Sequence, residues 1–163
     1  MNRFHFKDVE SLMIRFPHMF SEPMVSMDFF RGWFPDFVDL CFEVDSLLGE
    51  YNRSFYWCQL KEKFGSYTMR CAFRPQHGHL MPAALHLLHT EVRQRIGEAG
   101  QRMDTKCCVC GHPAKLGQHG AWAVLCDYHS RNARRARGDR RLLWELRAVP
   151  MKPANSYRWE TMV

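Results

Sequence analysis

The sequence predicts an α+β protein in which two or three helices pack on a small antiparallel β-hairpin, with a short cysteine-rich module and a basic helix on the C-terminal side. Three observations carry this prediction. Apolar residues recur at helical spacing before residue 49 and after residue 82, an aromatic-rich stretch between them has strand character, and cysteines pair closely after residue 106. We therefore expect an α+β domain over residues 1–102, a module over 103–130, and a basic helix and tail over 131–163.

Two helices are predicted in the N-terminal third. The first runs from Asp8, a candidate cap, to Phe20, and Pro17 bends or ends it. The second opens around Pro35 and ends at Gly49. Asp36 and Asp39 lie one turn apart on this helix, and we interpret them as part of a solvent-facing acidic surface. The predicted buried stripe comprises Phe34, Phe37, Val38, Cys41, Val44, Leu47 and Leu48.

A hairpin is predicted next, with strands at 54–62 and 66–73 joined by 63–65, where Gly65 takes a positive φ. Strict alternation would place Tyr56, Cys58 and Leu60 on one face of the first strand, and Phe55, Trp57 and Gln59 on the other. Core packing accounts for most of these aromatic residues. Phe64 at the tip is the residue whose exposure would distinguish base stacking from core packing.

Three further elements complete the prediction. A helix starts at Pro82 and runs to about Arg102, with a buried stripe at Leu85, Leu88, Val92, Ile96 and Ala99. Residues 122–125 form a short apolar strand. Residues 130–146 form a last helix that is weakened at Gly138.

Two paired motifs predict a metal site. Cys107-x-x-Cys110 and Cys126-x-x-His129 each place two soft ligands on one turn, fifteen residues lie between them, and Gly111 suits the sharp turn after the first pair. Four protein ligands leave no open position, so we expect structural Zn²⁺ in a zinc ribbon or treble-clef-like module. Alternatives are a disulfide, free side chains, a register shift to Cys108, or substitution by His112 or His119.

The net charge of +6 is concentrated after residue 101. Residues 102–147 hold ten basic and four acidic side chains, whereas the rest of the chain is balanced. Such a cluster suits an acidic protein surface or a nucleic-acid backbone, and the alternative is a solvated helix face. The candidate partner-binding residues are Arg131, Arg134, Arg135, Arg137, Arg140 and Arg141.

Other function classes find less support in the sequence. No apolar stretch is long enough for a transmembrane helix, and the first eight residues lack a signal-peptide core, so we expect a cytoplasmic location. A degenerate His-Asn-His or endonuclease VII-like nuclease would use His119 near Asn132, but Gln118 stands where such enzymes need a second catalytic or metal-binding side chain. Phosphate-binding glycine loops are absent.

Several motifs together resemble a family of small, largely uncharacterised proteins encoded by bacteriophages and prophages. The resemblance spans about residues 9–129 and implies a phage origin and a zinc-binding module, with no established reaction. The chain differs after Gly65, where the family has Gly-Leu-Arg, and in its long arginine-rich extension. The motifs are 15–20 (RFPHMF), 32–34 (GWF) with 39–41 (DLC), 59–65 (QLKEKFG), Cys107-x-x-Cys110-Gly111, and 125–129 (LCDYH).

From these observations we expect a non-enzymatic, phage-encoded zinc-binding protein that acts in the host cytoplasm and binds an acidic partner. In one version the partner is a host or defence protein complex that the phage inhibits, and in the other it is DNA or RNA.

Overall fold

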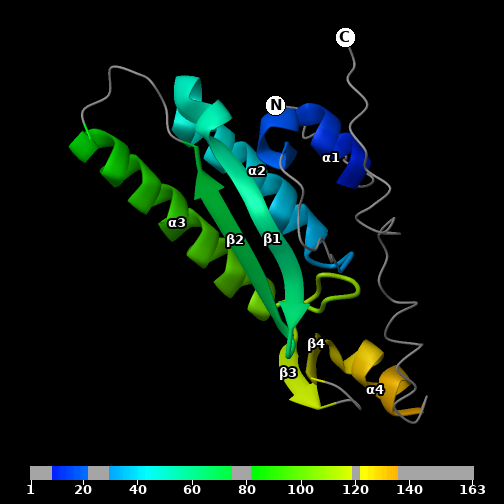
Figure 1. The fold of residues 1–163 in the computed structure, drawn as a ribbon. Helices are drawn as coiled ribbons and strands as arrows, with labels where there is room; N and C mark the ends of the chain where they lie inside the picture. Colours follow the sequence, from blue (N-terminus) through cyan, green and yellow to red (C-terminus); the bar gives the residue numbers. More distant parts are fainter. Residues whose placement is uncertain (1–8, 22–29, 75–81, 119–121, 136–163) are drawn as a thin grey trace.

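The computed structural model describes residues 9–21, 30–74, 82–118 and 122–135 (Figure 1). It confirms an α+β fold in which helices pack with a small two-stranded antiparallel sheet. The elements are α1 (Val9–Arg15), the 3-10 helix η1 (Pro17–Phe20), α2 (Phe34–Leu48), the 3-10 helix η2 (Gly49–Ser54), β1 (Phe55–Lys63), β2 (Ser66–Phe73), α3 (Pro82–Asp104), β3 (Lys115–Gln118), β4 (Trp122–Leu125) and α4 (Asp127–Arg135).

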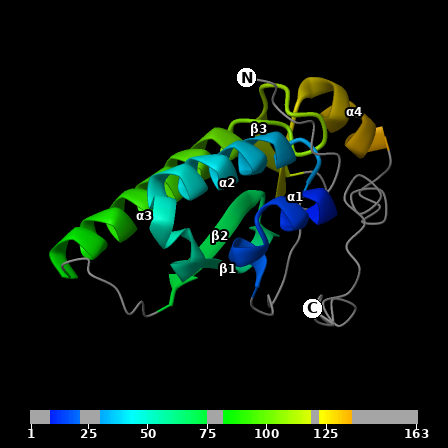
Figure 2. The same ribbon diagram turned by 90° about the horizontal axis from the view of Figure 1, so that it is seen from above.

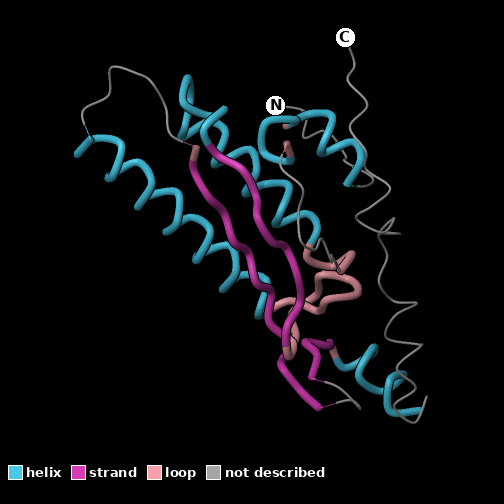
Figure 3. The backbone as a smooth tube through the Cα atoms, in the orientation of Figure 1, coloured by secondary structure: helices cyan, strands magenta, loops and turns pink. Residues whose placement is uncertain are grey.

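Helices α2 and α3 lie side by side along the long β1–β2 hairpin, and α1 lies beside the same assembly (Figure 2). The second hairpin, β3–β4, follows α3 at the turn end of the first hairpin (Figure 3). No helix among the described residues is long and apolar enough to cross a membrane.

The helix boundaries follow local sequence signals. Pro17 separates α1 from η1, as predicted, because a proline cannot continue the helical hydrogen-bond ladder. Helix α2 has proline in its first turn and ends at Gly49, which takes φ 52°. Helix α4 begins at Asp127, three residues earlier than predicted, and its predicted continuation to 146 lies outside the described residues.

The β1–β2 turn is a two-residue connection, with Phe64 at φ 53° and Gly65 at φ 84°. Positive φ at both positions matches the right-handed twist of the two strands. The Glu62 carboxylate accepts a hydrogen bond from the Gly65 N–H inside this turn.

A β-bulge at Cys58 corrects the predicted faces of β1. Trp57 pairs with Cys71 and Gln59 with Arg70, so β1 holds one extra residue between these pairs. Because the bulge shifts the alternation by one, Leu60 joins Phe55 and Trp57 on the buried face. The prediction that Leu60 shares a face with Tyr56 and Cys58 is therefore wrong.

One continuous core extends from α1 to β4. Its centre holds aromatic pairs such as Phe37–Trp57, with ring centroids 5.3 Å apart, and Trp33–Tyr67, at 5.5 Å. The same cluster includes Cys107 and Val124 of the cysteine-rich segment. Residue 102, the predicted boundary, lies inside α3, and the described residues after it that join this core are Met103, Cys107, Cys108, Ala123, Val124 and Leu125.

Candidate metal centre

The four predicted ligands come from two turns. Cys107 and Cys110 lie on the loop after α3, where the Gly111 N–H donates to the Cys107 carbonyl (2.8 Å) and the Cys107 N–H donates to the His112 carbonyl (2.7 Å). Gly111 closes this loop with φ 76°. Cys126 directly follows β4 and His129 lies in the first turn of α4, so the second pair is held at a strand–helix junction.

The ligand atoms have the spacing of a tetrahedral site. All four lie within 4.8 Å of one another. The Cys110 and Cys126 sulfurs are 3.8 Å apart, and His129 Nδ1 lies 3.5 Å from Cys107 Sγ and 3.2 Å from Cys126 Sγ. Bond lengths of about 2.3 Å to sulfur and 2.0 Å to nitrogen require about 3.8 Å between sulfurs and about 3.5 Å between sulfur and nitrogen. The three cysteines are free, and the Cys110–Cys126 separation is far longer than the distance of about 2.05 Å between the sulfurs of a disulfide.

The four ligands differ in how far they are exposed to solvent. Cys107 is fully buried, Cys126 and His129 are half-buried, and Cys110 is exposed. Burial, followed by the nearby His112, lowers the pKa of His129, which favours the neutral imidazole that binds metals. Burial acts to raise the pKa of Cys126, but hydrogen bonds led by the His129 N–H outweigh it and lower that pKa. Desolvation and neighbouring thiols raise the pKa of Cys110 to about 11.

Two residues before α2 support the Cys107–Cys110 loop. The Gly32 N–H donates to the Cys108 carbonyl at 2.8 Å, and Trp33 Nε1 donates to the Lys106 carbonyl at 2.8 Å. A β-carbon on Gly32 would lie 2.0 Å from the Cys107 carbonyl oxygen, so this position has no room for a side chain. The sequence alone does not indicate this role of Gly32, because its neighbours in the loop are about 75 residues further along the chain.

Cys108 is part of this support and lies outside the ligand set. Its side chain is buried, and its N–H donates to the Val124 carbonyl at 2.9 Å, which ties the loop to β4. Burial, with a smaller effect of Cys107, raises the pKa of Cys108. His112 is exposed and outside the cluster, and His119 lies outside the described residues.

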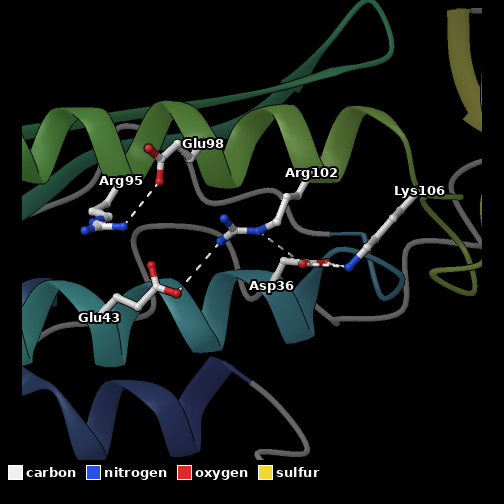
Figure 4. A network of polar contacts seen from close by, with 6 residues as sticks. All are labelled: Asp36, Glu43, Arg95, Glu98, Arg102 and Lys106. Atoms are coloured by element: carbon white, nitrogen blue, oxygen red, sulfur yellow. Dashed lines mark hydrogen bonds and ion pairs between the residues drawn. The ribbon is translucent and has the colours of Figure 1, made fainter.

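An ion-pair network, which the sequence analysis missed, joins α2 to the end of α3 (Figure 4). Asp36 is buried, and Lys106 Nζ donates to its two carboxylate oxygens at 2.7 and 2.8 Å. Arg102 lies 4.0 Å from both Asp36 and Glu43. The prediction that Asp36 faces solvent is wrong, because its partner Lys106 is brought to it only by the packing of α2 on α3.

The predicted basic surface is described only in part. Arg131 on α4 is exposed, and its Nε donates to the Asp127 carbonyl at 3.2 Å. Arg134 and Arg135 are in the last described turn of α4, whereas Arg137, Arg140 and Arg141 lie outside the described residues. A hollow of about 1020 Å³ lies at the cluster, and its lining includes the ligands Cys110, Cys126 and His129 together with His112, Lys115, Asp127, Tyr128 and Arg131.

The described residues offer no second metal site for the alternative nuclease function. Gln118 ends β3 and pairs with Trp122. Among the described residues, the four-ligand cluster is the only group of three or more His, Cys, Asp or Glu side chains spaced for a metal ion. No family model, curated protein or solved structure matches this chain, so its chemistry is inferred from the site itself.

Proposed function

We propose that this is a non-enzymatic zinc-binding protein whose metal centre fixes a cationic helix for an acidic partner. The observation that carries the proposal is the position of Cys126 and His129 at the start of α4, opposite the Cys107–Cys110 loop. Loop, β-hairpin and helix follow one another in the order of a treble clef. Three soft thiolates and one imidazole favour Zn²⁺, and four protein ligands leave no position for substrate.

The partner surface that we propose is the hollow between the β3–β4 hairpin and α4. Lys115 and Arg131 supply two cations to its lining and Asp127 one anion, and the first turns of α4 lead directly into the arginine-rich segment. Guanidinium groups pair well with carboxylates and phosphates. In keeping with the resemblance to phage proteins, we propose a host or defence protein as the partner, whose inhibition would benefit the phage.

The metal proposal is tested by elemental analysis of the purified chain, with one zinc ion per chain expected. Cys110→Ser should lower the zinc content, whereas Cys71→Ser, which alters a half-buried cysteine of β2, should leave it unchanged. A wild-type chain that binds no metal would refute this proposal.

The partner proposal is tested by affinity capture from host lysate, with and without nuclease treatment. Arg131→Gln combined with Lys115→Gln should reduce capture, whereas the exposed α3 variant Arg95→Gln controls for loss of charge. A specific protein that survives nuclease treatment and is lost from the double variant supports the proposal. Capture that is equal for both variants contradicts it.

Single-stranded nucleic acid is a second candidate partner, favoured by two exposed aromatic side chains. Phe64 is 81 % exposed at the tip of the long hairpin, and Trp122 on β4 is 49 % exposed. The backbone next to Phe64 is close to that of Trp122, since a β-carbon on Gly65 would be 3.3 Å from the Trp122 carbonyl carbon. The exposed Lys63 directly precedes Phe64 in the sequence. Stacking of bases on such rings contributes about 1–3 kcal/mol per base.

This candidate predicts that binding of a fluorescent single-stranded oligonucleotide weakens steeply with salt and drops further in Phe64→Ser. Leu87→Ser, at another exposed apolar residue, is the matched control. Binding that is independent of Phe64 and Trp122 would exclude base stacking on this surface.

A further inference from the structure

Three arginine side chains line a second hollow at the other end of the long hairpin. It has a volume of about 520 Å³ and lies where α1, η1, η2 and the end of β2 meet. Arg15 ends α1, Arg53 belongs to η2, and Arg74 directly follows β2, so three separate segments each bring an arginine to this hollow.

Two of these arginines are held in position. The Arg74 guanidinium donates to the Arg53 carbonyl at 3.0 Å and to Ser21 Oγ at 2.6 Å, and it lies 4.7 Å from the centre of the Tyr56 ring. The Arg15 guanidinium lies over the Phe16 ring, 5.2 Å from its centre. Such fixed guanidinium groups lose little conformational entropy when they bind an anion.

The carboxylate in the lining is already engaged by other partners. Asp45 lies 3.1 Å from His18 Nε2 and accepts a hydrogen bond from Asn52 Nδ2 at 3.0 Å. Within the described part of the chain, neither Arg15 nor Arg53 forms an ion pair. Among the described residues that line the hollow, three arginines therefore accompany one carboxylate.

His18 also lines this hollow, and the charges around it shift its pKa in both directions. Burial is the largest cause that lowers its pKa, and Arg53 and Arg15 lower it further, whereas Asp45 raises it. The net effect is a lowered pKa, which favours the neutral imidazole of His18.

We propose that this hollow binds the phosphate groups of a small phosphorylated ligand, such as a diphosphate. Planar guanidinium forks match phosphate oxygens with paired hydrogen bonds, and an anion relieves the mutual repulsion of the arginines. The volume is within the range of small-molecule sites. The hollow shares no lining residue with the one beside the metal cluster, so this binding is independent of the function proposed above.

Calorimetric titration of the full chain tests the proposal, with separate arms for inorganic pyrophosphate, a nucleoside diphosphate and a short single-stranded oligonucleotide. The first two are expected to bind with one-to-one stoichiometry at up to millimolar concentration. Arg53→Gln is the main variant, because its side chain donates no hydrogen bond within the described residues. Removal of one charge-assisted contact should weaken binding by about tenfold or more.

Arg95→Gln removes one charge from the exposed face of α3 and should leave the dissociation constant within about twofold of wild type. A urea unfolding curve confirms that Arg53→Gln is folded. The proposal is overturned if neither diphosphate binds, if only the oligonucleotide binds, or if Arg53→Gln and Arg95→Gln have the same effect. A loss confined to Arg53→Gln supports it, and the nucleoside arm then shows whether the ligand extends beyond phosphate.

Discussion

Gly32→Ala should destabilise the protein and weaken its metal binding together. The new β-carbon would lie 2.0 Å from the Cys107 carbonyl oxygen, 2.6 Å from the Gly111 nitrogen and 2.9 Å from the Cys108 carbonyl carbon. All three are backbone atoms, so no side chain can rotate away. The loop must move by about 1 Å to restore normal contact distances, whereas metal sites tolerate deviations of about 0.2 Å.

The magnitude follows from two contributions. Overpacking of a tight site costs about 1–3 kcal/mol, and loss of the Gly32–Cys108 hydrogen bond costs about 1 kcal/mol. We expect the free energy of unfolding of the zinc-loaded chain to fall by about 3 kcal/mol, as measured by urea unfolding. The zinc dissociation constant, measured by competition with a chelator, should rise in the same variant.

Gly97→Ala provides the matched control. Gly97 lies on the exposed face of α3, and a β-carbon there would meet nothing within 4 Å. This variant should gain up to about 1 kcal/mol of stability, since alanine favours a helix interior. The reasoning would be refuted if Gly32→Ala matched wild type both in unfolding free energy and in zinc affinity.

Three further predictions concern the contacts around the metal centre and the α3 surface. Lys106→Met should lower the unfolding free energy by about 2 kcal/mol in urea, because it leaves the buried Asp36 carboxylate without its main partner, and adding Asp36→Asn should recover much of the loss. Trp33→Phe should cost about 1–2 kcal/mol by thermal unfolding, since the Lys106 carbonyl loses its donor, and an unchanged midpoint would exclude this role. Burial, and then Arg93, lowers the pKa of His89 below its usual 6.5, so the folded state binds fewer protons than the unfolded state. The contribution of His89 to the free energy of unfolding should therefore be fully present above about pH 6.5 and should be lost as the pH falls below it. The free energy of unfolding should decrease less steeply with falling pH in His89→Phe, and an identical slope in that variant would contradict the assignment.

The ligand cluster could be predicted from the sequence because the spacing within each pair of ligands is a local property of the chain. Each pair of ligands lies within four residues of chain, and spacing alone places both on one turn. Helix ends at Pro17 and Gly49 and the turn at Gly65 were predictable for the same reason, because proline and glycine restrict or permit backbone angles wherever they occur.

Contacts between distant segments were not predictable in this way. The bulge at Cys58 interrupts an alternation that looks regular in the sequence, and only pairing with β2 reveals it. Strand β3 has a single large apolar residue, Leu116, so its pairing with β4 defines it better than its composition does. Asp36 has the sequence features of an exposed helix position, and its burial depends on a lysine 70 residues away.

The hydrogen bond between Trp33 and Lys106 joins residues 73 positions apart, which constrains the order of folding during synthesis. When α2 leaves the ribosome, the groups that cover Trp33 and Gly32 have not yet been translated. The aromatic side chains at the centre of the core can be fully covered only after the chain has emerged to the end of β4. Shorter nascent chains therefore expose a hydrophobic surface to chaperones and proteases.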